Sequence, residues 1–287
     1  MKEISPLKEL PFVKMEAVGN DLILVDARCL PKLDWTKIAC KMCDRHFGVG
    51  SDGLLVILSS DSADARMRMF NCDGTEDMCG NGLRCVAVYL HDNAGFNKQE
   101  LNIETLSGIK NVKIQQRQGK ARSVTVNMGP PIFAPDLLPT KIQEEPILRY
   151  PIRINRRTFK VTCLSMGTPH AVTFVRKLPN DELFLTVSPK IEKHRLFPER
   201  TSVIWAKVEG NNRIATRIWE RATGESLGCG TGACAALVAA KLLKKSNNQA
   251  YVTSKGGSLH VRWDGDVFKT GPAYEVFSGM WPLHGKR

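Results

Sequence analysis

The strongest constraint on this chain is a motif that occurs twice. The stretch MCGNGLRCVAVYL begins at Met78, and GCGTGACAALVAA begins at Gly228. With the two aligned at an offset of 150 residues, Cys79 coincides with Cys229. Each motif gives a cysteine, then Gly-x-Gly, then an apolar run that predicts a helix. Such a repeat predicts two halves of one fold, each with a cysteine just before a helix.

The self-similarity extends beyond these motifs. RHFGVGSDGLLVIL (residues 45–58) aligns with RLFPERTSVIWAKV (195–208) at the same offset of 150, and VGNDLILVD (18–26) aligns with MGTPHAVTF (166–174) at an offset of 148. The offset changes between these blocks, where loops tolerate insertions. Several weak matches in one order support a duplicated fold more strongly than any one of them.

Each half is predicted to be rich in short strands around one helix. The helices are predicted at NGLRCVAVYLHDN and GACAALVAAKLLKK, and both are apolar on most sides, which places each in the middle of its half. The remaining β-rich runs are bounded by Gly, Pro and Asn. We therefore predict an α+β fold of two pseudo-symmetric domains, each a β-barrel-like sheet wrapped around a central α-helix. The domains are predicted at residues 1–127 and 128–287, with the last strand a candidate for crossing back to the first.

Composition limits the class of protein. The chain has nine cysteines, an odd number that is atypical of a disulfide scaffold. The N-terminal MKEISPLKELPF lacks a long apolar stretch, and no run is long enough to cross a bilayer, so we expect a cytoplasmic protein with no membrane partner. The net charge of +12 is scattered and accompanies no nucleic-acid motif, so we expect no nucleic-acid partner.

A cysteine at a helix N-terminus has two chemical consequences. The helix dipole and free N–H groups favour the thiolate and can lower a cysteine pKa from about 8.5 into the range of roughly 3.5–7.5. The same donors can bind a carboxylate. If the two halves face each other, two thiols meet across a cleft, each beside a carboxylate-binding helix end.

That arrangement suits inversion of a stereocentre next to a carboxylate. One thiolate removes a proton from one face of carbon, and the other group, a thiol, delivers a proton to the opposite face. Peptide N–H groups would take up the charge that spreads onto the carboxylate. Cysteines at helix starts also serve redox chemistry, so the spacing alone leaves that alternative open.

Specific motifs favour epimerisation. The stretches KMEAVGNDLILVD, CDRHFGVGSDG, RMFNCDGTEDMCGNGLRC, NMGPP, LSMGTPH, FPERTS and RIWERATGESLGCGTGACAA run nearly the full length of the chain. In these motifs the chain resembles the diaminopimelate epimerase family. The resemblance implies a small-molecule amino-acid substrate, LL- or meso-diaminopimelate, and a reaction without pyridoxal phosphate, metal or other cofactor. It also implies a homodimer and a role in lysine and cell-wall precursor synthesis.

The resemblance also implies roles for particular residues. Cys79 and Cys229 match the two acid–base thiols. The residues that match substrate-contacting positions are Asn20, Asn71, Gly80, Asn81, Thr168, Ser202, Glu220, Arg221, Gly230 and Thr231, and His170 matches a supporting position. Other interpretations stay open for some of them: a turn residue for Asn20 and Asn71, a surface ion pair for Arg221, and a structural histidine for His170.

Four departures from the family pattern concern specificity. Thr168 and Ser202 stand where the family usually has Asn, in the region that holds the far end of diaminopimelate, and Ala222 stands where it usually has Gly. The stretch between Asn71 and Cys79 is one residue shorter than usual. A racemase of another amino acid therefore stays an alternative, as does a non-catalytic basic binding or redox module on the same fold.

One further cysteine pattern, CKMC at Cys40 and Cys43, is weak as a metal motif because it has no second pair. It lies in a predicted helix. We expect no metal site.

Overall fold

The computed structural model describes residues 7–210 and 212–283. By residue contacts the chain divides into two units. The N-terminal unit runs to Val126 and includes the segment from Pro272 onward, and the C-terminal unit is Asn127–Gly271. The predicted α+β fold of two similar units is confirmed. The domain limits 1–127 and 128–287 stay a prediction. The contacts group the last strand with the N-terminal unit, the crossing that the sequence analysis considered.

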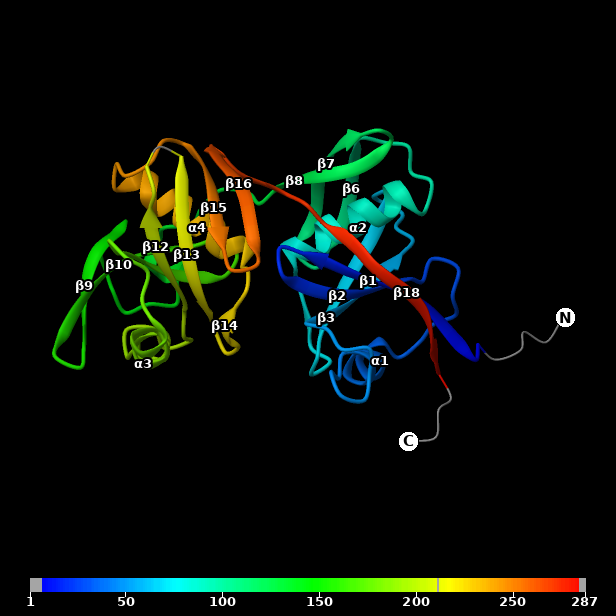
Figure 1. Ribbon diagram of the computed structural model, residues 1–287, viewed down its shortest axis with the longest axis horizontal. Helices are drawn as coiled ribbons and strands as arrows, with labels where there is room; N and C mark the ends of the chain where they lie inside the picture. The colour runs from blue at the N-terminus through cyan, green and yellow to red at the C-terminus, as the bar shows by residue number, and fades with distance from the viewer. Residues whose placement is uncertain (1–6, 211, 284–287) are drawn as a thin grey trace, which may run out of the picture. The chain divides into compact units, whose positions relative to one another are not determined.

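The N-terminal unit contains two helices and nine strands among the described residues. They are β1 (Glu9–Ala17), β2 (Asn20–Asp26), α1 (Trp35–Met42), β3 (Gly53–Leu58), β4 (Ala65–Asn71), β5 (Glu76–Asp77), α2 (Gly80–Asp92), β6 (Glu100–Thr105), β7 (Gly108–Arg117), β8 (Lys120–Asn127) and β18 (Tyr274–Pro282). Figure 1 shows β18, in red, running along β1, in blue, and the two strands pair antiparallel.

The C-terminal unit repeats this order. Its elements are η1 (Pro135–Leu137), β9 (Ile147–Ile154), β10 (Arg157–Ser165), β11 (Pro169–Phe174), α3 (Asp181–Glu192), β12 (Ser202–Val208), β13 (Arg213–Glu220), β14 (Gly224–Ser226), α4 (Gly230–Leu242), β15 (Gln249–Ser254), β16 (Gly257–Asp264) and β17 (Asp266–Gly271).

Strand pairing follows one scheme in both units. In the N-terminal unit β1–β2 is antiparallel, β2–β3 parallel, β3–β4 antiparallel, β4–β6 parallel, and β6–β7 and β7–β8 antiparallel. In the C-terminal unit the same sequence of pairings joins β10, β11, β12, β13, β15, β16 and β17. Corresponding strands therefore bring corresponding residues to the same place: Asn20 matches Thr168, and Asn71 matches Glu220.

One helix forms the centre of each unit. Helix α2 packs against β1, β2, β3, β4, β7 and β18, and α4 packs against β10–β13 and β15–β17. In α4 the run Ala233–Ala240 is buried throughout, because its small and aliphatic side chains can contact strands on every side. The central position of both helices, expected from their apolar sequence, is confirmed. Within the described part of the chain, none of the helices has the length and apolarity to cross a membrane.

Candidate active site

Both cysteines form the N-caps of the central helices. Cys79 precedes α2 and Cys229 precedes α4, each with extended backbone angles. The Sγ of Cys79 accepts the N–H of Gly82 at 3.2 Å, and the Sγ of Cys229 accepts the N–H of Gly232 at 3.4 Å. Sulfur thus takes the place that a Ser or Asp oxygen usually holds at a helix start. This contact favours negative charge on both sulfurs.

The third residue after each cap has to be glycine. A Cβ at Gly82 would lie 2.6 Å from Cδ2 of Leu55, and one at Gly232 would lie 2.7 Å from Cδ1 of Ile204. At Gly232 the added atom would also lie 3.3 Å from the Sγ of Cys229. The repeated Gly-x-Gly therefore lets each helix start close against a buried strand and leaves space beside the sulfur.

One asparagine contacts the sulfur of Cys79, which is half-buried, and a second asparagine bonds to the first. The Cys79 thiol donates to Oδ1 of Asn20 at 3.7 Å, and Nδ2 of Asn81 donates to the same oxygen at 3.4 Å. The buried guanidinium of Arg84 in turn donates to Oδ1 of Asn81 at 2.9 Å. The structure therefore brings three residues that the sequence predicted for the site into contact: Cys79, Asn20 and Asn81.

A charged network that the sequence did not predict anchors Asn20. Its Nδ2 donates to Asp52 at 2.8 Å, and Asp52 pairs with Arg45 at 2.7 Å. Arg45 also pairs with Asp21 at 2.8 Å, and Lys14 pairs with Asp21 at 2.6 Å. Burial raises the pKa of Asp21, but hydrogen bonds from Arg45 and Lys14 outweigh it and lower that pKa to about 2. The only signal in the sequence was that Arg45 falls in the repeat.

The surroundings of Cys229 are drier. Cys229 is 7 % exposed, and its Sγ lies 3.3 Å from Oγ1 of Thr231. Burial raises the pKa of the Cys229 thiol, and the neighbouring carboxylate of Glu220 raises it further. The helix dipole by itself favours a lower thiol pKa, and at Cys229 burial outweighs it. A dipole contributes at most roughly 2 kcal/mol, whereas full burial can shift a pKa by several units.

Thr231 continues into a line of polar contacts. Its Oγ1 accepts from the hydroxyl of Thr168 at 3.4 Å, and Oγ1 of Thr168 lies 3.2 Å from Nε2 of His170. His170 is 1 % exposed, and its Nδ1 has no hydrogen-bond partner among the described residues. Burial, helped by the charge of Arg221, lowers the pKa of His170 to about 3, so the imidazole is neutral at physiological pH.

Ser202 and Arg221 meet at the β13–β14 turn. The hydroxyl of Ser202 accepts the backbone N–H of Arg221 at 3.1 Å, which commits one of its lone pairs to the chain itself. The guanidinium of Arg221 forms no hydrogen bond or ion pair within residues 7–210 and 212–283. It therefore remains available for an anion.

The turn between β13 and β14 is held in a strained conformation by Glu192, a residue that the sequence analysis did not single out. Ala222 has φ of 66°, a left-handed conformation that favours glycine. Its N–H donates to the buried carboxylate of Glu192 at 3.0 Å, and the indole of Trp219 donates to the other oxygen at 2.8 Å. Glu192 therefore fixes the turn that carries Glu220 and Arg221. The left-handed backbone of Ala222, where the family usually has glycine, costs on the order of 1 kcal/mol of folding free energy.

Asn71 is placed differently from the residues around Cys79. Its Nδ2 donates to Oγ1 of Thr75 at 3.0 Å, and its N–H bonds to the carbonyl of Thr75. Asn71 is thus a turn residue in this structure, although it pairs with Gly53 at the end of the sheet where β2 and β3 begin.

Gly80 and Gly230 are the first residues of α2 and α4, where N–H groups have no intrahelical acceptor.

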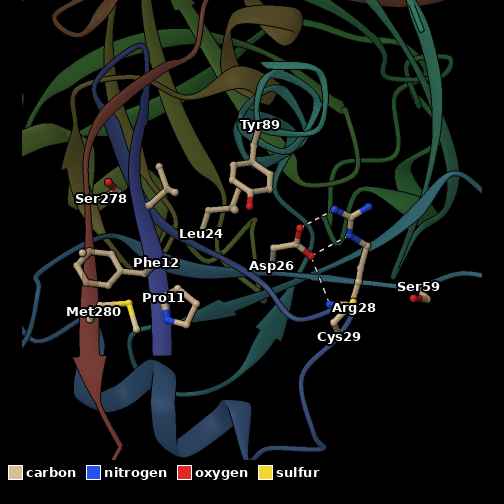
Figure 2. A pocket seen from close by; sticks show the side chains of 12 residues that line it. Pro11, Phe12, Leu24, Asp26, Arg28, Cys29, Ser59, Tyr89, Ser278 and Met280 are labelled. Carbon is tan, nitrogen blue, oxygen red and sulfur yellow. Dashed lines mark hydrogen bonds and ion pairs between the residues drawn. The ribbon is translucent and has the colours of Figure 1, made fainter. Parts of the chain in front are cut away.

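A groove of about 890 Å³ in the N-terminal unit lies away from these residues. It is lined by β1, β2, β18 and Tyr89, and none of the predicted site residues contributes to it. Figure 2 shows Asp26 and Arg28 pointing toward each other in this groove, where they form a two-point ion pair at 2.6 and 2.8 Å. These charged groups already have partners, so the groove is a poor candidate for the reaction. Within the described residues there is no cluster of three or more His, Cys, Asp or Glu side chains able to hold a metal ion.

Solved structures identify the class of fold. The chain resembles a hydroxyproline epimerase from Agrobacterium vitis with a TM-score of 0.72 and 15% identity, covering 96% of this chain and 93% of that one. It also resembles a phenazine biosynthesis protein of the PhzF family from Bacillus anthracis, with a TM-score of 0.67, 22% identity and coverage of 96% and 100%. The fold is therefore the one shared by these epimerase and PhzF-type proteins.

Sequence relatives identify the family. The family model for diaminopimelate epimerase matches residues 12–134 and 162–276. The diaminopimelate epimerase of Acetivibrio thermocellus is 44% identical over 279 residues, which is 95% of this chain and 99% of the relative. That of Moorella thermoacetica is 42% identical over 278 residues, with the same coverage. The chain belongs to the diaminopimelate epimerase family, an isomerase family.

Proposed function

We propose that this chain interconverts LL- and meso-2,6-diaminopimelate by two-base proton transfer between sulfur and the α-carbon. The observation that carries the proposal is the pair of N-cap cysteines, Cys79 and Cys229, in a chain of this family. Each sulfur accepts a helix N–H, and each contacts a polar side chain of its own unit.

In the proposed reaction both thiols act on one α-carbon from opposite faces. A thiolate takes the α-proton, and the carbon–hydrogen bonding pair passes to the α-carbon and its carboxylate. The second thiol then gives its proton to the other face, so the charges on the two sulfurs are exchanged. N–H groups of Gly80, Asn81, Gly230 and Thr231 hold the carboxylate and stabilise the negative charge that develops on it. No step uses pyridoxal phosphate, a metal or another cofactor.

The burial of Cys229 suggests which thiol holds the proton in the resting enzyme. Because burial and the charge of Glu220 both raise its pKa, Cys229 starts as the acid. Cys79 then starts as the base. In the reverse reaction the roles are exchanged.

The far end of the substrate is proposed to contact polar residues of both kinds: Thr168 and Ser202, which depart from the family pattern, and others that match it. The guanidinium of Arg221, which has no hydrogen-bond or ion-pair partner among the described residues, suits two parallel hydrogen bonds to the distal carboxylate. Asn20, Asn71, Thr168 and Ser202 supply further polar atoms, although the Ser202 hydroxyl and the Asn71 amide already bond within the chain. Glu220 and His170 support the thiols.

The same departures favour one second candidate, a cofactor-independent racemase of another amino acid. Thr168 and Ser202 present hydroxyls where an amide would offer two donors and an acceptor. A site with fewer fixed donors at its distal end discriminates less against a shorter substrate.

We further propose a cytoplasmic enzyme of lysine and cell-wall precursor synthesis that acts as a homodimer. Support for self-association comes from apolar side chains on β18. Tyr274, Val276, Phe277 and Met280 are each 46–57% exposed. Contiguous exposed apolar side chains are typical of interaction surfaces. Sedimentation equilibrium of the purified chain tests this, and a monomer at micromolar concentration would contradict it.

The proposed activity is tested by following stereochemistry. The purified chain is incubated with LL-diaminopimelate and, separately, with single L-amino acids, and the products are separated on a chiral column. We expect a mixture of LL and meso forms from diaminopimelate and no change in the others. Racemisation of another amino acid alone would favour the second candidate, and no change in any substrate would leave a non-catalytic module.

A further inference from the structure

A chain of hydrogen bonds runs from His170 through Thr168 and Thr231 to Cys229, and the number of protons available decides which group donates at each step. The Thr168 hydroxyl has one proton, which it donates to Oγ1 of Thr231 at 3.4 Å. Because that proton is used, the contact at 3.2 Å between Thr168 and Nε2 of His170 requires His170 to be the donor. Thr231, which accepts from Thr168, then has its own proton free for the Sγ of Cys229 at 3.3 Å.

The orphan nitrogen of His170 fits this direction. With the proton on Nε2, the nitrogen left without a partner among the described residues, Nδ1, is an acceptor. An unpaired buried acceptor is tolerated more readily than an unpaired buried N–H. The opposite tautomer would bury an unpaired donor. It would also turn the Thr168 proton toward His170 and away from Thr231.

We propose that Thr168 is a positioning residue for Cys229. It accepts a hydrogen bond from Nε2–H of His170 and donates one to Thr231, and so orients the Thr231 hydroxyl to donate to the Cys229 sulfur. This inference rests on the proposed function. It gives Thr168, which replaces the usual asparagine, a role toward the thiol in addition to any contact with the substrate.

The charged groups around the sulfur explain why an oriented donor is needed there. Glu220, at the end of β13, opposes negative charge on Cys229, and so does burial. Hydrogen bonds from Thr231 and from the N–H of Gly232 act in the opposite sense. Among the groups on β11, His170 is held neutral by burial and by the charge of Arg221, so the direction of the line stays the same across physiological pH.

The two units differ at this position. In the N-terminal unit the matching residue, Asn20, contacts its cysteine directly and accepts the thiol proton at 3.7 Å. Thr168 is too short to repeat that contact and reaches Cys229 only through Thr231. The contact between Thr168 and Thr231 is long for O–H···O, so its effect belongs at the lower end for a hydrogen bond to a charged group.

The test compares Thr168→Val, which removes the hydroxyl with little change of shape, with Thr168→Ser, which keeps it. We expect Thr168→Val to lower kcat by about 3- to 10-fold, with any lost substrate contact appearing separately as a rise in KM, and Thr168→Ser to restore kcat to within about twofold. Because Cys229 is the proposed acid, the basic limb of the pH profile of kcat/KM should move upward by about half to one pH unit in Thr168→Val alone.

A second readout does not depend on activity. In a Cys79→Ser background, the rate of iodoacetamide alkylation of Cys229 is followed against pH by peptide mass spectrometry. The curve should move to higher pH by about half to one unit in Thr168→Val and stay in place in Thr168→Ser. An unmoved curve in both variants would overturn the inference, as would a rise in KM with kcat unchanged. If the chain epimerises no amino acid, the proposed function fails while the alkylation curves still decide the role of Thr168.

Discussion

The two helix starts have the same backbone conformation at the cysteine N-cap, but the side chains around the two sulfurs differ. Cys79 is half-buried, touches the amide of Asn20, and is supported by a partly exposed network of charged residues. Cys229 is buried, lies beside Glu220, and is reached by hydroxyls and a neutral imidazole. Duplication explains the common cap, and divergence explains the different side chains.

In this internal repeat the position of the reactive group is kept, whereas the surroundings that control its protonation differ. A thiol in a dry site beside a carboxylate favours its neutral form. A pair of bases that must hold one proton between them needs such an asymmetry, because two ionised thiolates could not complete the transfer. The comparison therefore supports the proposal that Cys229 is the resting acid.

The largest expected effect comes from replacing each sulfur in turn. Cys79→Ser and Cys229→Ser should each lower epimerisation by about 10²- to 10⁴-fold, because a hydroxyl is a far weaker acid than a thiol at neutral pH. The rate of meso-diaminopimelate formation from the LL form measures this. The matched control is Cys29→Ser, an exposed cysteine outside the proposed site, which should keep the wild-type rate. Full turnover in either active-site variant would remove the two-base assignment.

A smaller effect distinguishes the two caps sterically. Gly82→Ala and Gly232→Ala both press on an aliphatic side chain, but only the second places a methyl group 3.3 Å from the Cys229 sulfur. Both should lose about 1–3 kcal/mol of unfolding free energy from overpacking. Gly232→Ala should also lose about 10- to 100-fold in kcat, because it displaces the reacting atom. Urea unfolding and steady-state kinetics on both variants measure the two losses, and an equal loss of kcat in both would show that the caps respond alike.

The smallest effect concerns stability and belongs to the N-terminal unit alone. The folded-state pKa of Asp21 lies below its ordinary value, at about 2, so its contribution is present above pH 4 and is lost as the pH falls toward 2. Asp21→Asn should therefore lower the free energy of unfolding by on the order of 2 kcal/mol at pH 7, and the gap to wild type should narrow below about pH 4.

Denaturant unfolding at pH 7 and pH 3 measures the effect of Asp21→Asn. Asp61→Asn, at an exposed carboxylate with no partner among the described residues, is the control and should match wild type at both values. A gap that stays the same at both pH values would mean that Asp21 acts by packing and not by charge.

The sequence was informative about the fold wherever a pattern is local. The two central helices and their cysteine caps followed from apolar runs behind Cys-Gly-x-Gly. Helix α3 was missed because DELFLTVSPKIE contains Pro189 and an uneven apolar pattern. It forms because Asn180 caps it and because Phe184 and Ile191 reach the core. The pairing of β18 with β1 joins the two ends of the chain and has no local signal.

The candidate site could be predicted as a set of residues but not as a set of contacts. Family motifs named Thr168, Thr231 and His170, yet nothing in their spacing showed that they form one line to Cys229. The networks through Asp52 and Glu192 depend on tertiary packing and were missed. The raised pKa of Cys229 could not be predicted, because a sequence shows that a helix begins and does not show how dry its first turn is.

The most direct test of the two-base account follows deuterium during a single direction of turnover. LL-diaminopimelate is incubated with the enzyme in deuterated water, and the early reaction mixture is separated into recovered LL form and new meso form for mass analysis. The account predicts one deuterium at the inverted α-carbon of the meso product, because its proton comes from the second thiol, and almost none in the recovered LL form. Deuterium entering both forms at the same early rate would contradict it, as would none entering either.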